Sequence, residues 1–390
     1  MTDHAPDSTT FAMALELLTE NGFESMAAAM EILFNEAMKI ERSEFLQAGP
    51  HERVEGRQGY ANGYRDKRVK TRVGELALRV PRTRGCDEPF YPRSLERGER
   101  SERALKLAVA QMYVEGVSTR RVTEVTRELC GLDVTSSQVS RATKLLDEEL
   151  NAWRKRPLSE FRYLILDARY EKVRHGGSVV DCAVLMALGV GADGKRTILG
   201  VSAALSEAEV HWRGFLEVLK ERGLHGLAMI TSDDHSGLRA ALRSVFPGVA
   251  WQRCQFHLQQ NAQSHVPRVS MRKEVASDLR AIFNAPDRSE ANRLLSLTVK
   301  RYEKSAPELA SWMESAVPEG LNVFDLPAAH WRRLRTSNSL ERLSREIKRR
   351  TRVATLFPNE DSLLRLVSAV AIEIAEDWET GRIYLSMDAE

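Results

Sequence analysis

The chain has few cysteines and no long apolar segment. Its four cysteines show none of the spacings of a disulfide framework, so we expect reduced thiols. No segment approaches the roughly 18 to 20 consecutive apolar residues of a membrane span. The first residues also lack the basic and apolar regions of a secretory signal. These absences predict a cytoplasmic protein that does not associate with membranes.

Aromatic residues and net charge are also low. Aromatic side chains make up 7% of the chain, and the formal net charge is only +2. A near balance of charge argues against uniform coating of a polyanion, so local clusters of charge carry the information about partners. A chain of 390 residues is too long for one ordinary domain, and 43% of its residues are apolar, which is enough to form buried cores. We therefore expect two or three domains, each with its own core.

Residues 1–60 are expected to form a helical N-terminal region. Apolar residues recur at helical spacing through residues 11–47, with a break near Asn21 and Gly22.

Residues 61–157 are predicted to form a DNA-binding domain that begins with a basic hairpin. Apolar residues alternate with polar ones through residues 63–84, with a turn near Gly74. Eight cations fall in this segment: Arg65, Lys67, Arg68, Lys70, Arg72, Arg79, Arg82 and Arg84. A solvated hairpin face is one interpretation. We favour a ribbon that contacts phosphates, because like charges so close together repel unless a polyanion neutralises them.

The second part of this domain has the pattern of a helix-turn-helix. Three short helical patterns are separated by Gly116 and Gly131, and the third follows a capping residue, Thr135. The last helix of such a motif enters the major groove of DNA. Ser137, Gln138 and Arg141 would then reach base edges and phosphates. A small helical bundle without this role explains the pattern equally well, and the adjacent basic hairpin favours DNA.

From residue 158 the pattern changes to an α/β domain. Five strands are expected, in residues 163–173, 179–190, 196–205, 227–232 and 249–252. Helical patterns separate the third, fourth and fifth of these strands. This order predicts a mixed sheet covered by helices and resembles an RNase H-like core. We expect the first part of the core in residues 158–268, a helical insertion in residues 269–330 and the last part of the core in residues 331–390.

Three acidic residues on separate elements are candidate metal ligands. Asp167 follows an apolar run where a central strand is expected to emerge, Asp233 ends another strand, and Glu341 lies in a helical stretch. Strand ends bind ligands in open α/β sheets, and carboxylates crowded together repel without a cation. Two Mg²⁺ ions, with Mn²⁺ as a substitute, would suit such oxygen ligands and support phosphoryl transfer. Solvated carboxylates and helix caps are the alternative.

Cations surround the third acid. Arg342, Arg345, Lys348 and Arg349 follow Glu341 within a few turns and would hold DNA phosphates beside the metals. A solvated helix face is the alternative. Two tryptophans nearby, Trp312 and Trp331, are either core residues or platforms on which an unpaired base stacks.

Cys254 and His257 have the spacing of half a zinc site. The chain contains no second pair of Cys or His at ligand spacing, so we expect no bound zinc.

Several segments together resemble one known family. They are residues 71–76, 112–120, 166–170, 232–238, 251–257 and 337–350. Over residues 50–385 the chain resembles bacterial insertion-sequence transposases of the Mutator-like DDE family. The resemblance implies an RNase H-like core in which Asp167, Asp233 and Glu341 are the catalytic triad. It also implies that Cys254 and His257 support the pocket. Asp234 competes for the second position, and the Ser-Asp-x-x-x-Gly-Leu frame favours Asp233.

The resemblance also implies an activity. Such an enzyme binds the terminal inverted repeats of its element, cleaves the DNA ends and joins the freed 3′-hydroxyl to target DNA. Two double-stranded ends must be handled together, which implies a homodimer or a larger self-assembly. The alternatives are a transposase-derived DNA-binding regulator that is no longer catalytic and an RNase H-like nuclease without strand transfer.

Overall fold

The computed structural model describes residues 8–354, 356–379 and 383–387. The chain divides into two compact units, Met1–Leu145 and Leu146–Glu390. The predicted DNA-binding domain, residues 61–157, extends past this boundary. Helix α6 (Asp147–Lys155) belongs to the second unit, because the Asp147 carboxylate binds the Arg365 guanidinium at 2.6 and 2.9 Å. Arg154 also donates to Ser368 at 2.7 Å.

The first unit begins with two helices, of which the second packs on a hairpin and the first packs on the second. Helix α1 (Ser8–Asn21), a short 3-10 turn η1 (Gly22–Ser25) and helix α2 (Met26–Leu46) confirm the break expected near Gly22. The hairpin consists of β1 (Tyr60–Thr71) and β2 (Gly74–Arg84). Met38 of α2 packs against three apolar residues on one face of β2: Leu76, Leu78 and Val80.

Both edges of the hairpin have hydrogen-bond partners. Glu31 and Asn35 of α2 accept from the backbone N–H groups of Ala77 and Arg79 at 2.9 and 2.8 Å. The outer edge of β1 pairs with residues 100–102 through Lys70. An exposed strand edge is a template for unwanted pairing, so this arrangement stabilises a two-stranded sheet that would be marginal by itself.

Three short helices follow, as the sequence predicted: α3 (Arg103–Val114), α4 (Thr119–Cys130) and α5 (Ser136–Ala142). Ser118 caps α4 by accepting from the Arg121 N–H at 3.2 Å. Gly131 ends α4 with a φ of 66°, a conformation that glycine adopts without strain. Thr135 and Gln138 form a reciprocal capping box at the start of α5.

The second unit contains a five-stranded mixed sheet with the order β5-β4-β3-β6-β7. Strands β3 (Phe161–His175), β4 (Ser178–Gly191) and β5 (Arg196–Ala204) are antiparallel neighbours. Strands β6 (Met229–Ser232) and β7 (Ala250–Arg253) continue the sheet parallel to β3. The predicted mixed sheet with flanking helices is confirmed.

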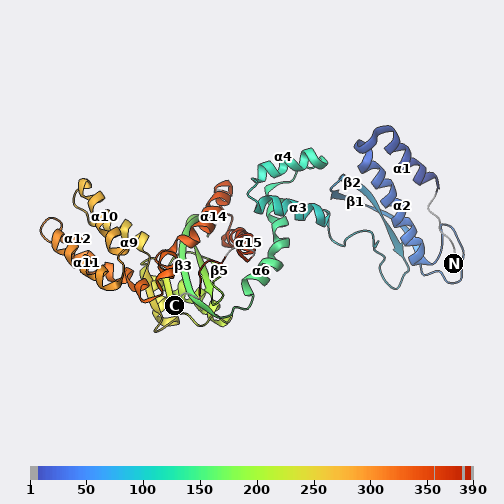
Figure 1. The fold of residues 1–390 in the computed structure, drawn as a ribbon. Helices are drawn as coiled ribbons and strands as arrows, with labels where there is room; N and C mark the ends of the chain where they lie inside the picture. The colour runs from blue at the N-terminus through green and yellow to red at the C-terminus, as the bar shows by residue number, and fades with distance from the viewer. Residues whose placement is uncertain (1–7, 355, 380–382, 388–390) are drawn as a thin grey trace. The chain divides into compact units, whose positions relative to one another are not determined.

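Helices cover both faces of this sheet. Helices α7 (Glu209–Glu221) and α8 (Ser236–Val245) pack on one face with Leu164 and Leu166 of β3. Helices α14 (Glu341–Ala354) and α15 (Glu360–Glu379) pack on the other face with Tyr163 and Ile165 (Figure 1). Because both faces of β3 are buried at residues 163–166, this part of its sequence is continuously apolar instead of alternating.

A helical insertion with its own core separates β7 from α14. Its main helices are α9 (Gln255–Ala262), α10 (Arg272–Phe283), α11 (Arg288–Tyr302), α12 (Pro307–Ala316) and α13 (Ala328–Leu334). In Figure 1, α10, α11 and α12 form a lobe beside the sheet. A short 3-10 turn, η2 (Thr143–Leu146), lies at the boundary between the units, and five others belong to the second unit: η3 (Gln263–His265), η4 (Val269–Met271), η5 (Val317–Gly320), η6 (Asn322–Asp325) and η7 (Ser337–Leu340). Across the described residues, no helix combines the length and apolar character needed to cross a membrane.

Candidate active site

Asp167 lies on β3, and Asp233 directly follows the end of the neighbouring parallel strand β6 at the same level. The pairing of β3 with β6 ends where Ile165 faces Thr231, and each aspartate follows two residues later. Asp167 ends the apolar run of β3 but not the strand, because β3 continues to His175 alongside β4, close to the expected strand of residues 163–173. The parallel pairing of β3 with β6 ends just before Asp167. The carboxylate of Asp167 therefore lies beside the loop that carries Asp233.

The surroundings of Asp167 favour its neutral form. The pKa of Asp167 is raised to about 6, chiefly by burial; His257 and the Ala168 N–H act to lower it, and the charges of Asp233 and Glu207 act to raise it. That N–H donates to Asp167 Oδ1 at 3.0 Å. A buried carboxylate beside like charges is stabilised by a bound cation. Carboxylate oxygens are also the donors that hard divalent cations prefer, so these two aspartates fit such an ion.

His257 provides positive charge beside the pair. Its Nδ1 lies 3.7 Å from Asp233 Oδ1. Its interaction with the thiol of Cys254 raises the pKa of His257 to about 9, burial opposes this, and the charges of Asp233 and Asp167 reinforce it. Burial acts to raise the pKa of Cys254, but the interactions with His257 and Ser337 hold it below its usual value. Cys254 and His257 are therefore beside the second acid, as the resemblance implied.

Asp234 has a different environment from Asp233. Its two carboxylate oxygens bind Arg239 at 3.1 Å and the buried Arg253 at 2.9 Å. Both arginines also bind Glu319, at 2.8 and 3.1 Å. This network occupies Asp234, whereas Asp233 faces Asp167 and His257. The geometry favours Asp233 as the second acid.

Glu341 is the exposed first residue of α14. Arg345 and Lys348 follow it on the same exposed helical face, at spacings of one and two turns. Arg169 of β3 donates to the Ser344 carbonyl at 2.5 Å and so attaches the start of α14 to the strand that carries Asp167. In the part of the chain that the structure describes, no three acidic, histidine or cysteine side chains lie close enough to hold a metal ion. The structure thus groups Asp167 with Asp233 and leaves Glu341 outside this pair.

Two of the predicted DNA contacts on α14 have acidic partners. Arg342 binds Asp377 at 2.6 Å, and Arg349 binds Glu346 at 2.9 Å. All four side chains are at the surface, where such pairs contribute little stability and exchange readily for phosphate.

The hairpin cations divide into two groups. Four have partners within the first unit: Lys67 with Tyr91, Lys70 with the Asp133 carbonyl, Arg68 with Glu75 and Arg72 with Glu102. The other four are exposed, namely Arg65, Arg79, Arg82 and Arg84, and Arg79 lies over the Tyr64 ring at 4.7 Å.

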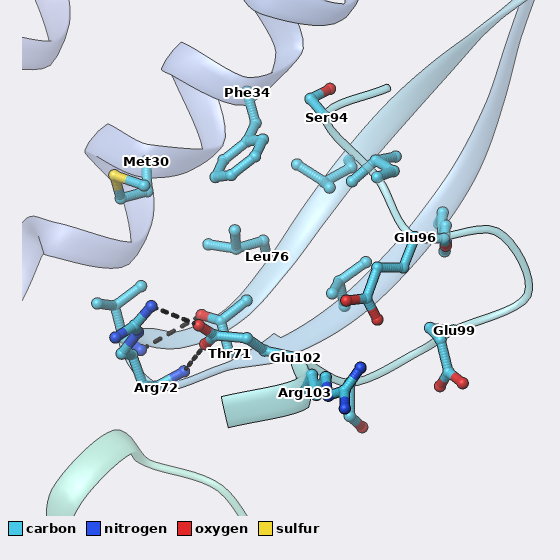
Figure 2. Close-up of a pocket in the computed structure, with 16 residues that line it drawn as sticks. Met30, Phe34, Thr71, Arg72, Leu76, Ser94, Glu96, Glu99, Glu102 and Arg103 are labelled. Carbon is cyan, nitrogen blue, oxygen red and sulfur yellow. Dashed lines mark hydrogen bonds and ion pairs between the residues drawn. The ribbon is translucent and has the colours of Figure 1, made fainter. Parts of the chain in front are cut away.

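Figure 2 shows a pocket of about 270 Å³ on one side of the hairpin, where Met30 and Phe34 of α2 face Leu76. Three acids, Glu96, Glu99 and Glu102, are part of its lining. Three cations, Lys67, Arg72 and Arg103, line the same pocket and balance this charge, so the exposed arginines of the hairpin are the better candidates for DNA contact.

The predicted contacts on α5 also differ from one another. Ser137 and Arg141 are exposed one turn apart, and Arg141 Nε donates to the Ser137 carbonyl at 3.3 Å. The side-chain oxygen of Gln138 accepts from the Thr135 N–H at 2.8 Å in the capping box. Ser137 and Arg141 are therefore better placed than Gln138 to reach DNA.

Both tryptophans pack against protein groups. Trp312 stacks on His265 with ring centroids 5.1 Å apart, and Trp331 donates to the Leu326 carbonyl at 2.7 Å. These contacts favour a core role over base stacking for both.

The sequence analysis assigned no role to Arg169, Glu207 or Gly237. A Cβ at Gly237 would lie 2.3 Å from the Glu207 carbonyl oxygen, so only glycine lets the first turn of α8 approach this segment. The glycine of the Ser-Asp-x-x-x-Gly-Leu frame was visible in the sequence. The segment that Gly237 contacts could not be identified from the sequence, because that segment lies elsewhere in the chain.

Comparisons with known proteins agree with the resemblance. The family model described as "Transposase, Mutator family" matches residues 7–381. The transposase for insertion sequence element IS406 of Burkholderia multivorans is 57% identical over 96% of this chain and 97% of its own length. The transposase for ISRM5 of Rhizobium meliloti is 42% identical, over 97% of this chain and 95% of its own. The transposase for IS256 in transposon Tn4001 of Staphylococcus aureus is 38% identical, over 91% of this chain and 92% of its own.

Proposed function

The chain belongs to the Mutator family of transposases, and from that premise we propose that it cleaves the DNA ends of its element and transfers them by metal-dependent DDE chemistry. The observation that carries the proposal is the position of Asp167 on β3 at one level with Asp233, which directly follows the adjacent strand β6. The sheet order supports an RNase H-like core, since three antiparallel strands precede two parallel ones on the far side of β3.

In this proposal Asp167 and Asp233 hold the metal ions, and Glu341 completes the set. The chemistry supplied by two bound Mg²⁺ ions, or Mn²⁺ in their place, is activation of water or a 3′-hydroxyl and stabilisation of the leaving oxygen. His257 offsets the charge of the aspartates and holds Asp233 in place. Arg345 and Lys348 bind phosphates beside Glu341, which positions the scissile strand.

The first unit is proposed to recognise the terminal inverted repeats. Ser137 and Arg141 of α5 would contact base edges, and Arg65, Arg82 and Arg84 would contact phosphates. Paired ends require at least a homodimer on double-stranded DNA, and the reaction takes place in the cytoplasm, on nucleoid DNA.

The test is incubation of the purified full chain with labelled element ends, target DNA and Mg²⁺. We expect cleaved ends and joined products from the wild type. Asp167→Asn, Asp233→Asn and Glu341→Gln should lose both products and keep end binding, because a neutral amide oxygen binds Mg²⁺ much more weakly than a carboxylate and does not offset its charge. Binding without cleavage by the wild type would favour the regulator, and cleavage without joining would favour the nuclease.

A further inference from the structure

The neck of the insertion consists of residues 253–255, where the chain leaves the sheet, and residues 334–337, where it returns. We propose that Thr231, Cys254 and Ser337 are positioning residues that latch this neck and thereby set the location of Glu341 relative to Asp233. The inference rests on the proposed function, because it assigns Glu341 a place in catalysis.

The first link of the latch comes from strand β6. The Thr231 hydroxyl donates to the Leu334 carbonyl at 2.7 Å, and both residues are buried. Close by, the Gln255 N–H donates to the Arg335 carbonyl at 2.9 Å. The returning chain is therefore bonded to the strand that ends beside Asp233 and to the helix that leaves the sheet.

The second link is the buried sulfur of Cys254. Its Sγ accepts from the Ser337 N–H at 3.4 Å and from the Ser337 hydroxyl at 3.6 Å. The Cys254 N–H donates to the Ser232 carbonyl at 2.8 Å. One residue thus connects Ser232, which precedes Asp233, with Ser337, which opens the turn η7 that leads into Glu341.

Apolar packing alone would not fix this turn. Leu340 and Leu343 are buried in the core beside the sheet, but such contacts are non-directional and permit rotation and sliding. Hydrogen bonds to buried groups are directional, and loss of one leaves a buried carbonyl unsatisfied, which is unfavourable. The latch therefore supplies the orientation that packing does not.

The experiment uses the full chain with Thr231→Val, which keeps the shape and removes the donor, and Thr231→Ser, which restores the hydroxyl. Thr298→Val is the matched control, because the buried Thr298 hydroxyl donates to the Leu294 carbonyl at 2.8 Å within α11, in the insertion. Four quantities are measured: end cleavage against Mg²⁺ concentration, end binding without metal, the unfolding temperature, and hydrogen exchange of the amides of residues 337–341 without metal or DNA.

For Thr231→Val we expect the Mg²⁺ concentration at half-maximal cleavage to rise about tenfold or more, as for other residues that orient ligands. Exchange at residues 337–341 should be faster, and end binding should be unchanged. Thr231→Ser should behave like the wild type. Thr298→Val should change neither the Mg²⁺ response nor the exchange at residues 337–341, because the Leu294 carbonyl keeps the backbone N–H of Thr298 as its donor within α11. If Thr231→Val does not fold, Ser337→Ala replaces it. Its Mg²⁺ requirement and its exchange at residues 337–341 should both rise, by less than we expect for Thr231→Val.

A wild-type Mg²⁺ response in a folded Thr231→Val variant would overturn the latch. A raised Mg²⁺ requirement in Thr298→Val, equal to that of Thr231→Val, would overturn it too. Unchanged exchange at residues 337–341 would also overturn it, and this readout needs no catalysis. If Glu341→Gln cleaves like the wild type, the proposed function fails instead, and the exchange measurement still decides whether the latch exists.

Discussion

Asp233 and Asp234 show how the environment gives two identical side chains different roles. Asp233 faces a buried carboxylate and a histidine, whereas Asp234 is bound by Arg239 and Arg253. A carboxylate held by two guanidinium groups has little capacity left for a metal ion. Its contribution is to stability, because it neutralises the buried Arg253.

We therefore predict opposite effects for the two asparagine variants. Asp233→Asn should lose cleavage and strand transfer while keeping its free energy of unfolding. Asp234→Asn should keep most of its activity and lose about 1–3 kcal/mol of stability, because it no longer accepts charged hydrogen bonds from partly buried arginines. Denaturant unfolding and the cleavage assay on the same preparations measure both. Active Asp233→Asn and inactive Asp234→Asn would reverse our assignment of the second acid.

Gly237 provides a second test at the residue scale. Gly237→Ala would place a methyl group against the backbone of Glu207 and Glu209, at 2.3 and 2.8 Å from their nearest atoms. Backbone cannot move aside as a flexible side chain can, so we expect about 1–3 kcal/mol of destabilisation. Cleavage should fall as well, because α8 follows directly from the loop of Asp233.

Gly214→Ala is the control for this variant. Gly214 lies within α7, and no atom lies within 4 Å of an added Cβ. Alanine there should be neutral or stabilise the helix by up to about 1 kcal/mol. Equal unfolding free energies for the two variants would contradict the steric explanation.

At the scale of elements, the sequence predicted most of the fold. The five strands and their order followed from apolar runs and turns, because burial on both faces of β3 and β4 leaves a strong signal. The capped helices α4 and α5 followed from Ser118, Gly131 and Thr135 for the same local reason.

Features that depend on pairing between distant residues could not be predicted. The place of α6 in the second unit depends on the contact of Asp147 with Arg365 in α15. The link between Cys254 and Ser337 joins residues far apart in the chain, so no local pattern reveals it. For the same reason the three acids could be identified from the sequence, but the distances between them in the folded chain could not.

One prediction at the scale of elements concerns DNA recognition by helix α5. In the full chain, Ser137→Ala with Arg141→Ala should reduce the preference for terminal repeats over random DNA by about 1–3 kcal/mol for each base that α5 can no longer read. Titrations of both DNAs at two salt concentrations measure this preference. Arg293→Ala, on the exposed surface of α11, is the control and should bind both DNAs like the wild type. An equal decrease in affinity for both DNAs would mean that α5 binds only the DNA backbone.

At the scale of the whole molecule, the reaction itself constrains the assembly. Each chain contributes one pair of aspartates at the sheet, yet an element has two ends that must be joined to one target. Symmetric assemblies place one such site at each of two related DNA ends. The requirement for paired ends can therefore be tested without a structure of the complex.

The test mixes wild-type chains with Asp233→Asn chains by co-expression, so that subunits combine before they meet DNA. If both members of a homodimer must be active, joining of paired ends should fall with the square of the wild-type fraction, to about one quarter at equal mixing. Cleavage of single ends should fall only to about one half, because each active subunit still cuts its own end. The Asp233→Asn chains must bind ends normally for this comparison, which a binding titration checks first. A linear fall in paired joining would show that one chain completes both ends alone, and the homodimer proposal would then be wrong.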